Sequence, residues 1–388
     1  MDLDFDFLIV GAGFSGLVLA ERLSTQLGRS SLVVEKRDHI GGNAYDYYDP
    51  VGVRVHKYGP HYFRTNSDRV LQYLSQFTQW HPVEYEVRSF TDGKLWHFPV
   101  NLNTFEQFLG RPSTSAEFEE WLRDQQVEIK HPKNSEELIV SQVGWELYKK
   151  FYEGYTLKHW KRHPRELSPS VCGRIPIRTN RDNRYLSESF QALPRDGYTA
   201  MFDRMLEAAG QNVTVRLNTS FEDVRQGISF RHLIYTGPID AYFEQSLGAL
   251  PYRSLRFEFE SFSPAQLEER EREHGRPGFW QPFLQVNYPN DHDFTRIVEI
   301  KHVTGQPCGH TTIVREYPED FGPGTEPYYP VPTSDSEALY RRYKQLAAEE
   351  ENVSFVGRLA RYRYFNMDQV TAMALKEFDR LAEQYGSA

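Results

Sequence analysis

The sequence predicts an α/β protein in which a discontinuous Rossmann-like domain carries a small helical insert and an antiparallel β-sheet domain. Three observations support this prediction. A glycine-rich turn follows the first apolar strand, Phe7–Val10, and a second strand ending in Gly357 precedes a helix near the end of the chain. Between them, apolar and polar residues alternate from Ser254 to Val314, which is typical of antiparallel strands. At 388 residues the chain is long enough for two or three domains.

The glycine-rich turn predicts a dinucleotide site. Gly11 permits the tight turn, Gly13 lets the backbone approach a pyrophosphate, and Gly16 lets the following helix pack closely on the strand. Glu35 ends the second strand at the position where a carboxylate accepts hydrogen bonds from a ribose. A turn that only packs the core is the alternative. The residues predicted to bind the cofactor here are Gly11, Gly13, Phe14, Ser15, Gly16, Glu35, Lys36, Gly42 and Asn43.

The glycine pair Gly41–Gly42 favours FAD over NAD, because flavoproteins bring a second stretch of backbone close to the pyrophosphate. Near the end of the chain, a strand reaches Gly357 and Arg358, and Met367 and Asp368 open a helix. Backbone amides at such a helix start can reach the flavin. The alternative is a closing helix that merely packs.

These motifs divide the chain into interleaved parts. We expect the discontinuous Rossmann-like FAD-binding domain to comprise residues 1–80, 190–250 and 335–388. Helical spacing of apolar residues assigns residues 104–170 to the helical insert. The antiparallel sheet, or substrate domain, then comprises residues 81–103, 171–189 and 251–334.

Composition narrows the function. A net charge of -9 argues against nucleic-acid binding, and no apolar run is long enough to predict a membrane span. The first strand begins by Phe5, so we expect no signal peptide and a cytoplasmic protein. The two cysteines have no metal-ligand spacing, and neither a hydrolase elbow nor a zinc motif occurs, so we expect no metal site. The flavin itself is therefore expected to carry the chemistry.

One basic segment interrupts this acidic chain. Residues 158–184 contain eight Lys and Arg but only two acidic residues, with aromatic residues within and beside them. Arginine binds phosphate oxygens and aromatic faces stack on bases and sugars, which favours a pocket for a phosphorylated, ring-bearing ligand. A solvated basic face above an aromatic core is the alternative.

Several longer stretches resemble the UDP-galactopyranose mutases of the bacterial type, over nearly the whole chain. The tyrosine–tryptophan stretch and the final tyrosine–methionine–aspartate stretch are specific to that family. The matching stretches are residues 58–61, 98–104, 154–160, 174–178, 295–299, 315–317 and 362–368.

The resemblance implies a non-redox isomerase that interconverts UDP-galactopyranose and UDP-galactofuranose for galactofuranose-containing glycans. In that family, N5 of reduced FAD (FADH⁻) attacks the anomeric carbon and expels UDP, and the sugar recloses as a five-membered ring before UDP returns. The resemblance further implies activation by a reductant such as NAD(P)H, and a homo-oligomer.

Roles for individual residues also follow from the resemblance. Arg174 and Arg296 would grip the diphosphate during catalysis, and His61 would lie beside the flavin. Residues 160–185 would form a mobile lid. The other implied substrate residues are Tyr185, Tyr317 and Tyr364 at the phosphates, Tyr155 and Phe151 at the uracil, Trp160 and Asn101 at the sugar, and Tyr152, Thr156, Asn287 and Asn366; Tyr62 and Tyr364 would also contact the cofactor.

Three positions depart from the family pattern: Arg64 stands for a histidine, Asn366 for an aspartate and His159 for a glutamine. They leave open a different nucleotide sugar, such as an N-acetylated one. Trp160 has two interpretations, a sugar platform or lid packing. Two other functions compete with the mutase: an FAD amine oxidase or desaturase, which would need an apolar tunnel, and a catalytically silent nucleotide-sugar-binding protein.

Overall fold

A parallel five-stranded sheet forms one end of the molecule. The computed structural model describes residues 4–386. All neighbouring strands of this sheet are parallel, and the central residues of β2, β1 and β11 are buried because helices cover both faces, whereas the edge strand β10 is partly exposed. In sheet order the strands are β10 (Val213–Arg216), β2 (Ser31–Val34), β1 (Phe5–Val10), β11 (Phe230–Tyr235) and β17 (Val353–Phe355).

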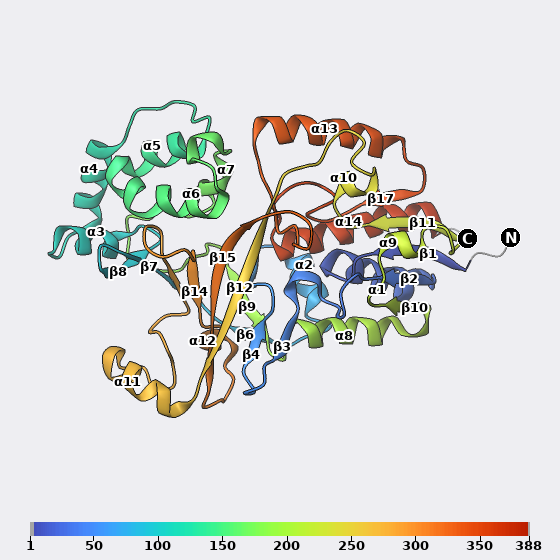
Figure 1. The fold of residues 1–388 in the computed structure, drawn as a ribbon, viewed down its shortest axis with the longest axis horizontal. Coiled ribbons are helices and arrows are strands. Elements are labelled where there is room, and N and C mark those ends of the chain that lie inside the picture. The colour runs from blue at the N-terminus through green and yellow to red at the C-terminus, as the bar shows by residue number, and fades with distance from the viewer. Residues whose placement is uncertain (1–3, 387–388) are drawn as a thin grey trace.

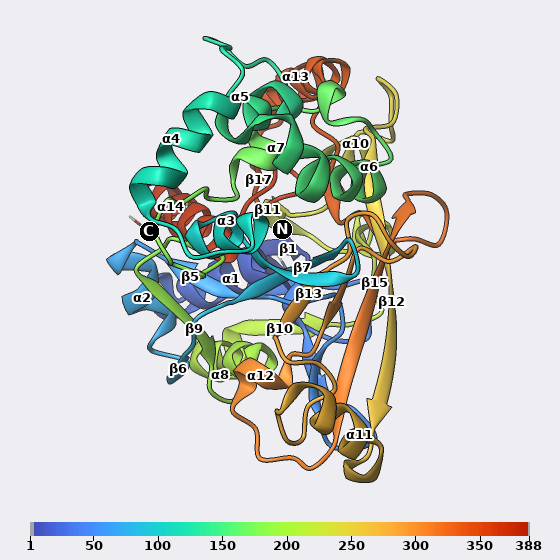
Figure 2. The same cartoon turned by 90° about the vertical axis from the view of Figure 1, so that its left-hand side faces the viewer.

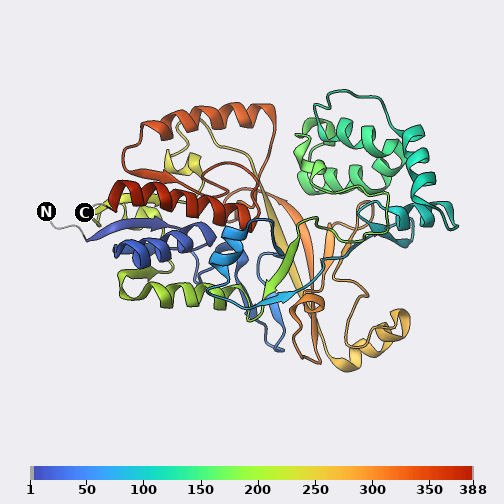
Figure 3. The same ribbon diagram turned by 180° about the vertical axis from the view of Figure 1, so that it is seen from behind.

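Two groups of helices cover this sheet. On one face α1 packs between α8 and α14 over a core that includes Phe7, Ile9 and Val33, and on the other face Leu8, Leu32 and Val34 meet a second apolar cluster. The helices of the first face are α1 (Phe14–Leu27), α8 (Tyr198–Ala209) and α14 (Met367–Tyr385), and α2 (Asp68–Leu74) packs beside them; those of the second are α9 (Phe221–Val224), α10 (Ile239–Tyr242) and α13 (Ser334–Glu349). The start of β1 lies beside the end of α14, where Phe7 and Tyr385 are 5.5 Å apart between ring centroids (Figure 3).

The second large sheet has seven strands and runs through the middle of the molecule (Figure 1). Its strands are antiparallel, as the alternation predicts, except for the parallel pair β13–β7. The long strands β12 and β15 extend from beside the insert to the end that carries α11 (Pro264–His274) (Figure 2). In order the strands are β16 (Tyr329–Pro330), β12 (Tyr252–Phe262), β15 (Thr311–Asp320), β14 (Arg296–Val298), β13 (Gln285–Asn287), β7 (Val87–Thr91) and β8 (Lys94–Phe98).

The helical insert stands apart from the parallel sheet and follows strand β8 (Figure 1). It has its own apolar core, built around residues such as Phe105, Phe118 and Tyr148. Its helices are α3 (Leu102–Leu109), α4 (Ser115–Gln125), α5 (Ser135–Tyr148), α6 (Gly154–Trp160) and α7 (Ser170–Gly173).

Smaller elements complete the fold between the two sheets. They are the hairpin β3 (Asp46–Tyr48) and β4 (Arg54–His56), the sheet of β5 (Phe63–Thr65), β9 (Phe190–Pro194) and β6 (Trp80–Pro82), and α12 (Lys301–Thr304). The observed strands of the parallel sheet come from three separated stretches of sequence, whereas the exact domain limits stay a prediction. Among residues 4–386, no helix combines the length and apolarity that crossing a bilayer requires.

Candidate active site

A cavity of about 430 Å³ lies where β1 and β2 end and α1 begins. Gly11 has φ +100°, and a Cβ there would lie 2.2 Å from Thr236 Oγ1. Gly13 and Gly42 face each other so closely that a Cβ on Gly42 would lie 3.0 Å from the Gly13 Cα. Gly11 and Gly42 have no room for a Cβ, and the free N–H groups at the start of α1 favour a phosphate there.

Most of the sequence-predicted cofactor residues line this cavity. Gly16 does not: a Cβ on it would lie 1.9 Å from the Gly11 carbonyl oxygen, because it packs α1 against β1 as expected. The predicted residues that line the cavity are Gly11, Gly13, Phe14, Ser15, Glu35, Lys36, Gly42, Asn43, His61, Gly357, Arg358 and Met367.

Glu35 is buried at the edge of the cavity with both oxygens engaged by backbone. Its Oε2 accepts a hydrogen bond from Ala12 N at 2.9 Å, and its Oε1 accepts one from Arg37 N at 3.1 Å. Arg37 in turn donates to Asn43 at 2.9 Å and to Glu326 at 3.0 Å. Sequence reasoning missed Arg37 and Glu326, which lie in strand-to-helix and loop segments without a motif.

His61 lines the same cavity. Its Nδ1 is 2.9 Å from the Gly59 carbonyl oxygen, and its backbone N–H donates to His56 Nδ1 at 3.1 Å. Burial, reinforced by His56 and then by the charges of Arg358 and Arg296, lowers the pKa of His61 to about 3. The imidazole is therefore neutral at pH 7.

Beyond His61, two arginines and several tyrosines form a second cluster. Arg296 on β14 is held by Glu316 on β15: its Nε and Nη2 donate to Glu316 Oε2 at 3.0 and 2.6 Å. Burial opposes the charge of Arg296, but Glu316 keeps the pKa of the guanidinium above its ordinary value. Asn287 is the cross-strand neighbour of Arg296 on β13, so all three side chains share one face of the sheet.

Arg174 is the residue that follows α7. Its guanidinium lies 5.1 Å from the ring centroid of Tyr364. The guanidinium of Arg358 lies 4.7 Å from the same centroid, and the Tyr364 ring stacks on Tyr329 with 5.9 Å between the ring centroids. Burial opposes ionisation of Tyr364, but the charges of Arg174 and Arg358 lower its pKa to about 8. Tyr155 and Tyr185 lie close to the same arginines.

Arg358 connects the two halves of the site. It lines the cofactor cavity, and its guanidinium lies over the rings of Tyr329 and Tyr364. Its Nη2 donates to the Phe365 carbonyl oxygen at 2.7 Å. The arginine–tyrosine cluster, defined as Tyr155, Arg174, Tyr185, Arg296, Tyr329 and Tyr364, therefore adjoins the cofactor cavity directly.

The prediction for Tyr317 is wrong. Tyr317 follows Glu316 on β15, and successive side chains of a strand point to opposite faces. Its ring lies on the outer face, 4.1 Å below the guanidinium of Arg256. Tyr329, which sequence reasoning missed, takes the position beside the arginines; it comes from the two-residue strand β16, which has no usable periodicity.

The contacts of Asn101 are those of a helix cap, and its role at the sugar stays a prediction. Asn101 is fully buried and caps α3: its Oδ1 accepts from Thr104 N at 3.1 Å. Its Nδ2 donates to Asn183 Oδ1 at 2.9 Å. The motif that carries Asn101 therefore starts the first helix of the insert.

The predicted substrate residues between Phe151 and Trp160 are mostly buried in the insert. Phe151 is 3% exposed and packs against Trp96, and Thr156 lies 3.5 Å from Cys172 Sγ. The hydroxyl of Tyr152 is buried with no hydrogen-bond partner among residues 4–386. Trp160 packs on Leu167, Val331 and Tyr329, as the lid-packing interpretation has it. Of this group, Tyr155 alone is counted among the arginine–tyrosine cluster.

Three predicted residues have contacts other than those expected. Tyr62 stacks on Tyr85 and donates to Gln285 at 3.1 Å. Asn366 caps α14 and accepts from Arg64 Nη2 at 3.0 Å, while Arg64 Nε donates to Glu188 at 2.9 Å. Asp368 Oδ1 is buried without a hydrogen-bond partner in the described part of the chain.

Both interpretations of the basic segment hold in part. Arg174 joins the cluster, whereas Lys158 donates to the carbonyl oxygens of Tyr288 and Asp291 at 2.6 and 2.8 Å and pins that loop. Arg181 pairs with Glu106 and Arg184 with Asp182, near the surface.

One group of possible metal ligands lies away from this site, in the insert. Oxygen or nitrogen atoms of Glu136, Glu153 and His163 lie within 4.8 Å of one another. The two nitrogens of His163 each face a different carboxylate: Nδ1 lies 3.6 Å from Glu136 and Nε2 lies 3.3 Å from Glu153. Sequence spacing gave no sign of this group.

Comparisons with known proteins agree with this architecture. Residues 150–364 match the family model for UDP-galactopyranose mutase, and residues 9–77 match that for an NAD(P)-binding Rossmann-like domain. Among solved structures, a reduced UDP-galactopyranose mutase superposes with a TM-score of 0.76 at 17% identity, covering 99% of this chain and 95% of that one. A putrescine oxidase bound to putrescine superposes with a TM-score of 0.57 at 14% identity over 98% and 99% of the two chains.

Curated relatives align over almost their whole length. A Klebsiella pneumoniae protein named "Probable UDP-galactopyranose mutase" is 35% identical over 96% of this chain and 94% of its own. The dTDP-fucopyranose mutase of Escherichia coli is 31% identical over 97% of both, and the UDP-galactopyranose mutase of Mycoplasma pneumoniae is 30% identical over 98% and 96%. With these matches and a Rossmann-like domain joined to an arginine–tyrosine cluster, the chain belongs to the UDP-galactopyranose mutase family of sugar-nucleotide isomerases.

Proposed function

We propose that the protein binds FAD and interconverts UDP-galactopyranose and UDP-galactofuranose, for galactofuranose-containing glycans. One observation carries the proposal: Arg174 and Arg296, from different parts of the chain, lie near the same tyrosines, beside a cavity with a dinucleotide-type glycine cradle. An amine oxidase would need an apolar tunnel where these arginines lie.

The cofactor cavity fits FAD in its donors and its shape. Gly11, Gly13 and Gly42 leave room for a pyrophosphate at the start of α1, and Glu35 would accept hydrogen bonds from the ribose. Gly357, Arg358 and Met367 would hold the flavin end, beside His61. When bound and reduced, FAD would supply a nucleophilic N5 for the anomeric carbon, so that isomerisation needs no net oxidation.

Arg174 and Arg296 would grip the diphosphate of the substrate. Guanidinium groups bind phosphate oxygens through charge-assisted hydrogen bonds, which strengthen as negative charge builds up on the departing UDP. Glu316 holds Arg296 in one orientation through Nε and Nη2, which leaves Nη1 available to a ligand. The hydroxyls of Tyr155, Tyr185, Tyr329 and Tyr364 would add neutral donors around the same phosphates.

Neutral His61 adds no positive charge beside the sugar end of the cavity. Because its pKa is about 3, it cannot serve as a proton donor at neutral pH in its imidazolium form. The Gly59 carbonyl oxygen lies 2.9 Å from Nδ1, so a proton on Nδ1 would leave Nε2 as an acceptor for a hydroxyl or an N–H group. We propose that His61 orients the cofactor or sugar through this acceptor.

The experiment that tests the proposal is anaerobic turnover of UDP-galactofuranose with the purified protein. The protein should be yellow and release free FAD on denaturation. Activity should be absent with the oxidised protein, appear after dithionite or NADPH, and continue for many turnovers per reducing equivalent. Consumption of one reductant per product would favour an oxidoreductase, and full activity of the oxidised protein would exclude the flavin mechanism.

The same assay determines the sugar. UDP-galactose, UDP-N-acetylgalactosamine and dTDP-fucose should be compared, because the Escherichia coli relative is a dTDP-fucopyranose mutase. The highest kcat/KM should belong to UDP-galactose. Arg174→Lys should retain part of the activity and Arg174→Ala almost none, since lysine keeps the charge but cannot form a bidentate contact.

A further inference from the structure

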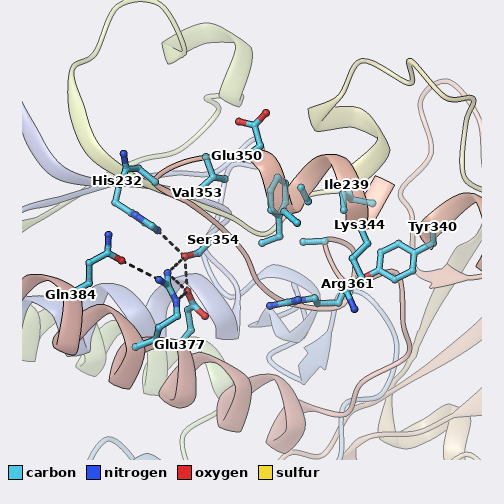
Figure 4. A pocket seen from close by; sticks show the side chains of 16 residues that line it. His232, Ile239, Tyr340, Lys344, Glu350, Val353, Ser354, Arg361, Glu377 and Gln384 are labelled. Atoms are coloured by element: carbon cyan, nitrogen blue, oxygen red, sulfur yellow. Dashed lines mark hydrogen bonds and ion pairs between the residues drawn. The ribbon is translucent and has the colours of Figure 1, made fainter. Parts of the chain in front are cut away.

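A second cavity, of about 380 Å³, lies between α13, β17 and α14 (Figure 4). It is lined by different residues from the cofactor cavity. The mutase activity proposed above requires none of them.

One wall of this second cavity is a fixed polar network. Ser354 Oγ donates to Glu377 Oε1 at 2.5 Å, accepts from Arg380 Nη2 at 2.9 Å and lies 2.7 Å from His232 Nε2. Burial and then the charge of Arg380 lower the pKa of His232 to about 4, so this imidazole is neutral. Arg380 and Glu377 form an ion pair at 2.7 Å. The polar side chains of this wall therefore have hydrogen-bond or ion-pair partners.

The opposite wall carries two cations. Arg361 and Lys344 lie together on the far side of the cavity from His232, Ser354 and Glu377 (Figure 4). Within residues 4–386, neither side chain has a carboxylate within the 4.0 Å of an ion pair. Arg361 is half-buried, so its charge loses part of its hydration without gaining a direct partner.

The lining as a whole favours an anion. Lys344, Arg361 and Arg380 face Glu350 and Glu377, and Glu377 is already paired. Glu350 is exposed and accepts from the Tyr242 hydroxyl at 2.8 Å. The remaining surface is apolar or aromatic, which suits the body of a small organic molecule: Ile239, Tyr340, Ala347, Ala348, Val353, Phe355 and Ala360.

We propose that this second cavity binds a small phosphate ester. Arg361 and Lys344 would bind the phosphate, and the apolar body of the ligand would pack on Ile239 and Phe355. The cavity volume falls within the range of small-molecule sites, about 300–1,000 Å³. A guanidinium and an ammonium together suit the several oxygens of a phosphate better than a single carboxylate would.

The second cavity is connected to the cofactor cavity by one turn. Gly357, Arg358 and Leu359 line the cofactor cavity, and the next two residues, Ala360 and Arg361, line the second. Arg361 N donates to the Gly357 carbonyl oxygen at 3.0 Å, which makes these five residues a compact unit. A ligand that immobilises Arg361 should therefore also steady Gly357 and Arg358 and slow the release of FAD.

The test is calorimetric titration of the yellow holoprotein with phenyl phosphate, in the presence of saturating UDP to fill the arginine–tyrosine cluster. One site with a dissociation constant of roughly 0.1 mM is expected. Arg361→Met should weaken this binding at least tenfold and Lys344→Met severalfold. The matched control is Arg341→Met, because Arg341 is exposed on α13, the helix of Lys344, and does not line the cavity. This variant should bind phenyl phosphate as tightly as the wild type does.

Two further measurements complete the test. Inorganic phosphate should bind more weakly than phenyl phosphate, because it lacks the apolar body, and phenyl phosphate should slow FAD release on warming in the wild type but not in Arg361→Met. Binding that disappears when UDP is present would place phenyl phosphate in the substrate site and overturn the proposal. Equal affinity in the wild type, Arg361→Met and Lys344→Met would overturn it as well. The calorimetric result depends on neither the sugar substrate nor turnover, so its failure is separate from failure of the proposed function.

Discussion

Arg296 and Glu316 are cross-strand neighbours on β14 and β15, and the guanidinium places both Nε and Nη2 on a single carboxylate oxygen. Glu316 is 1% exposed, and its other oxygen has no hydrogen-bond partner among residues 4–386. The carboxylate thus orients the arginine from behind while the guanidinium faces the tyrosines.

Glu316→Gln should lower kcat/KM for the sugar nucleotide about tenfold, equivalent to about 1.4 kcal/mol. The reason is that the Arg296 guanidinium loses the carboxylate charge that orients it. Steady-state kinetics of the reduced protein measures this effect. Glu260→Gln is the matched control, since Glu260 on β12 pairs with Arg315 on the outer face of the same sheet and its loss should leave the kinetics unchanged. Wild-type kinetics in Glu316→Gln would show that Arg296 needs no such anchor.

Tyr329→Phe should weaken UDP binding by at least about tenfold, whereas Tyr317→Phe should not change it. The two tyrosines lie on strands of the same sheet, but Tyr329 alone faces Arg296 and Arg358. Loss of one hydrogen bond to a charged phosphate corresponds to about 1.5–3 kcal/mol. Titration with UDP distinguishes them, and equal losses in both variants would contradict the assignment of the two faces.

UDP affinity should fall as the pH rises from 7 to 9. The pKa of Tyr364 is about 8, below its ordinary value, so the phenolate forms in this range and repels the diphosphate. Bound UDP would in turn raise the pKa of Tyr364, so binding above pH 8 should take up a proton, which calorimetry in two buffers of different ionisation enthalpy detects. In Tyr364→Phe the affinity should be nearly independent of pH; an unchanged slope would assign the titration to another group.

Gly13→Val should give a folded protein without FAD. The nearest atom to a Cβ at Gly13 is the Gly42 Cα at 3.7 Å, so the backbone tolerates the side chain, but the added methyl groups occupy the position of the pyrophosphate. Absorbance of the purified protein and thermal unfolding provide the two measurements. Gly28→Asn is the control, because Gly28 caps α1 at the other end in open space and should retain the cofactor. A yellow Gly13→Val protein would place the pyrophosphate elsewhere.

Acid should destabilise the holoprotein through its buried neutral histidines. Burial and then Arg54 lower the pKa of His56 to about 3, so below pH 6.5 the unfolded chain binds a proton that the folded chain does not. The free energy of unfolding should therefore fall as the pH drops from 6.5 towards 3, by up to about 1.4 kcal/mol per pH unit for each such group. Denaturant unfolding of His56→Gln at pH 7 and pH 5 should show a smaller difference than the wild type, and an equal difference would exclude His56.

The parts of the site that depend on local backbone could be predicted from sequence. The glycine spacing before Glu35 places a tight turn, a close approach and a helix start within one short segment, and the cavity forms there. The parts that depend on strand pairing could not. Arg315, Glu316 and Tyr317 are consecutive, and only the register with β14 decides which of them faces Arg296.

The fold was predictable for a similar reason. The parallel sheet follows from buried apolar strands next to amphipathic helices, whereas the parallel pairing of β13 with β7 joins segments almost two hundred residues apart and leaves no local signal. Asn101 illustrates the converse difficulty: an asparagine three residues before Thr104 is a helix-capping signal, but the family motif that contains it suggested a ligand contact. Helical spacing likewise could not separate core aromatics such as Phe151 from the surface of a base pocket.

The two backbone amides that hold Glu35 also have a consequence for cofactor selection. They fix the carboxylate in place before any ligand arrives, and each oxygen keeps a lone pair for a sugar hydroxyl. A phosphate on that sugar would instead bring a second negative charge against a buried, immobile acid. The site should thus discriminate against 2′-phosphorylated adenosines by repulsion. NADPH can therefore reduce this protein only by binding at a different part of its surface.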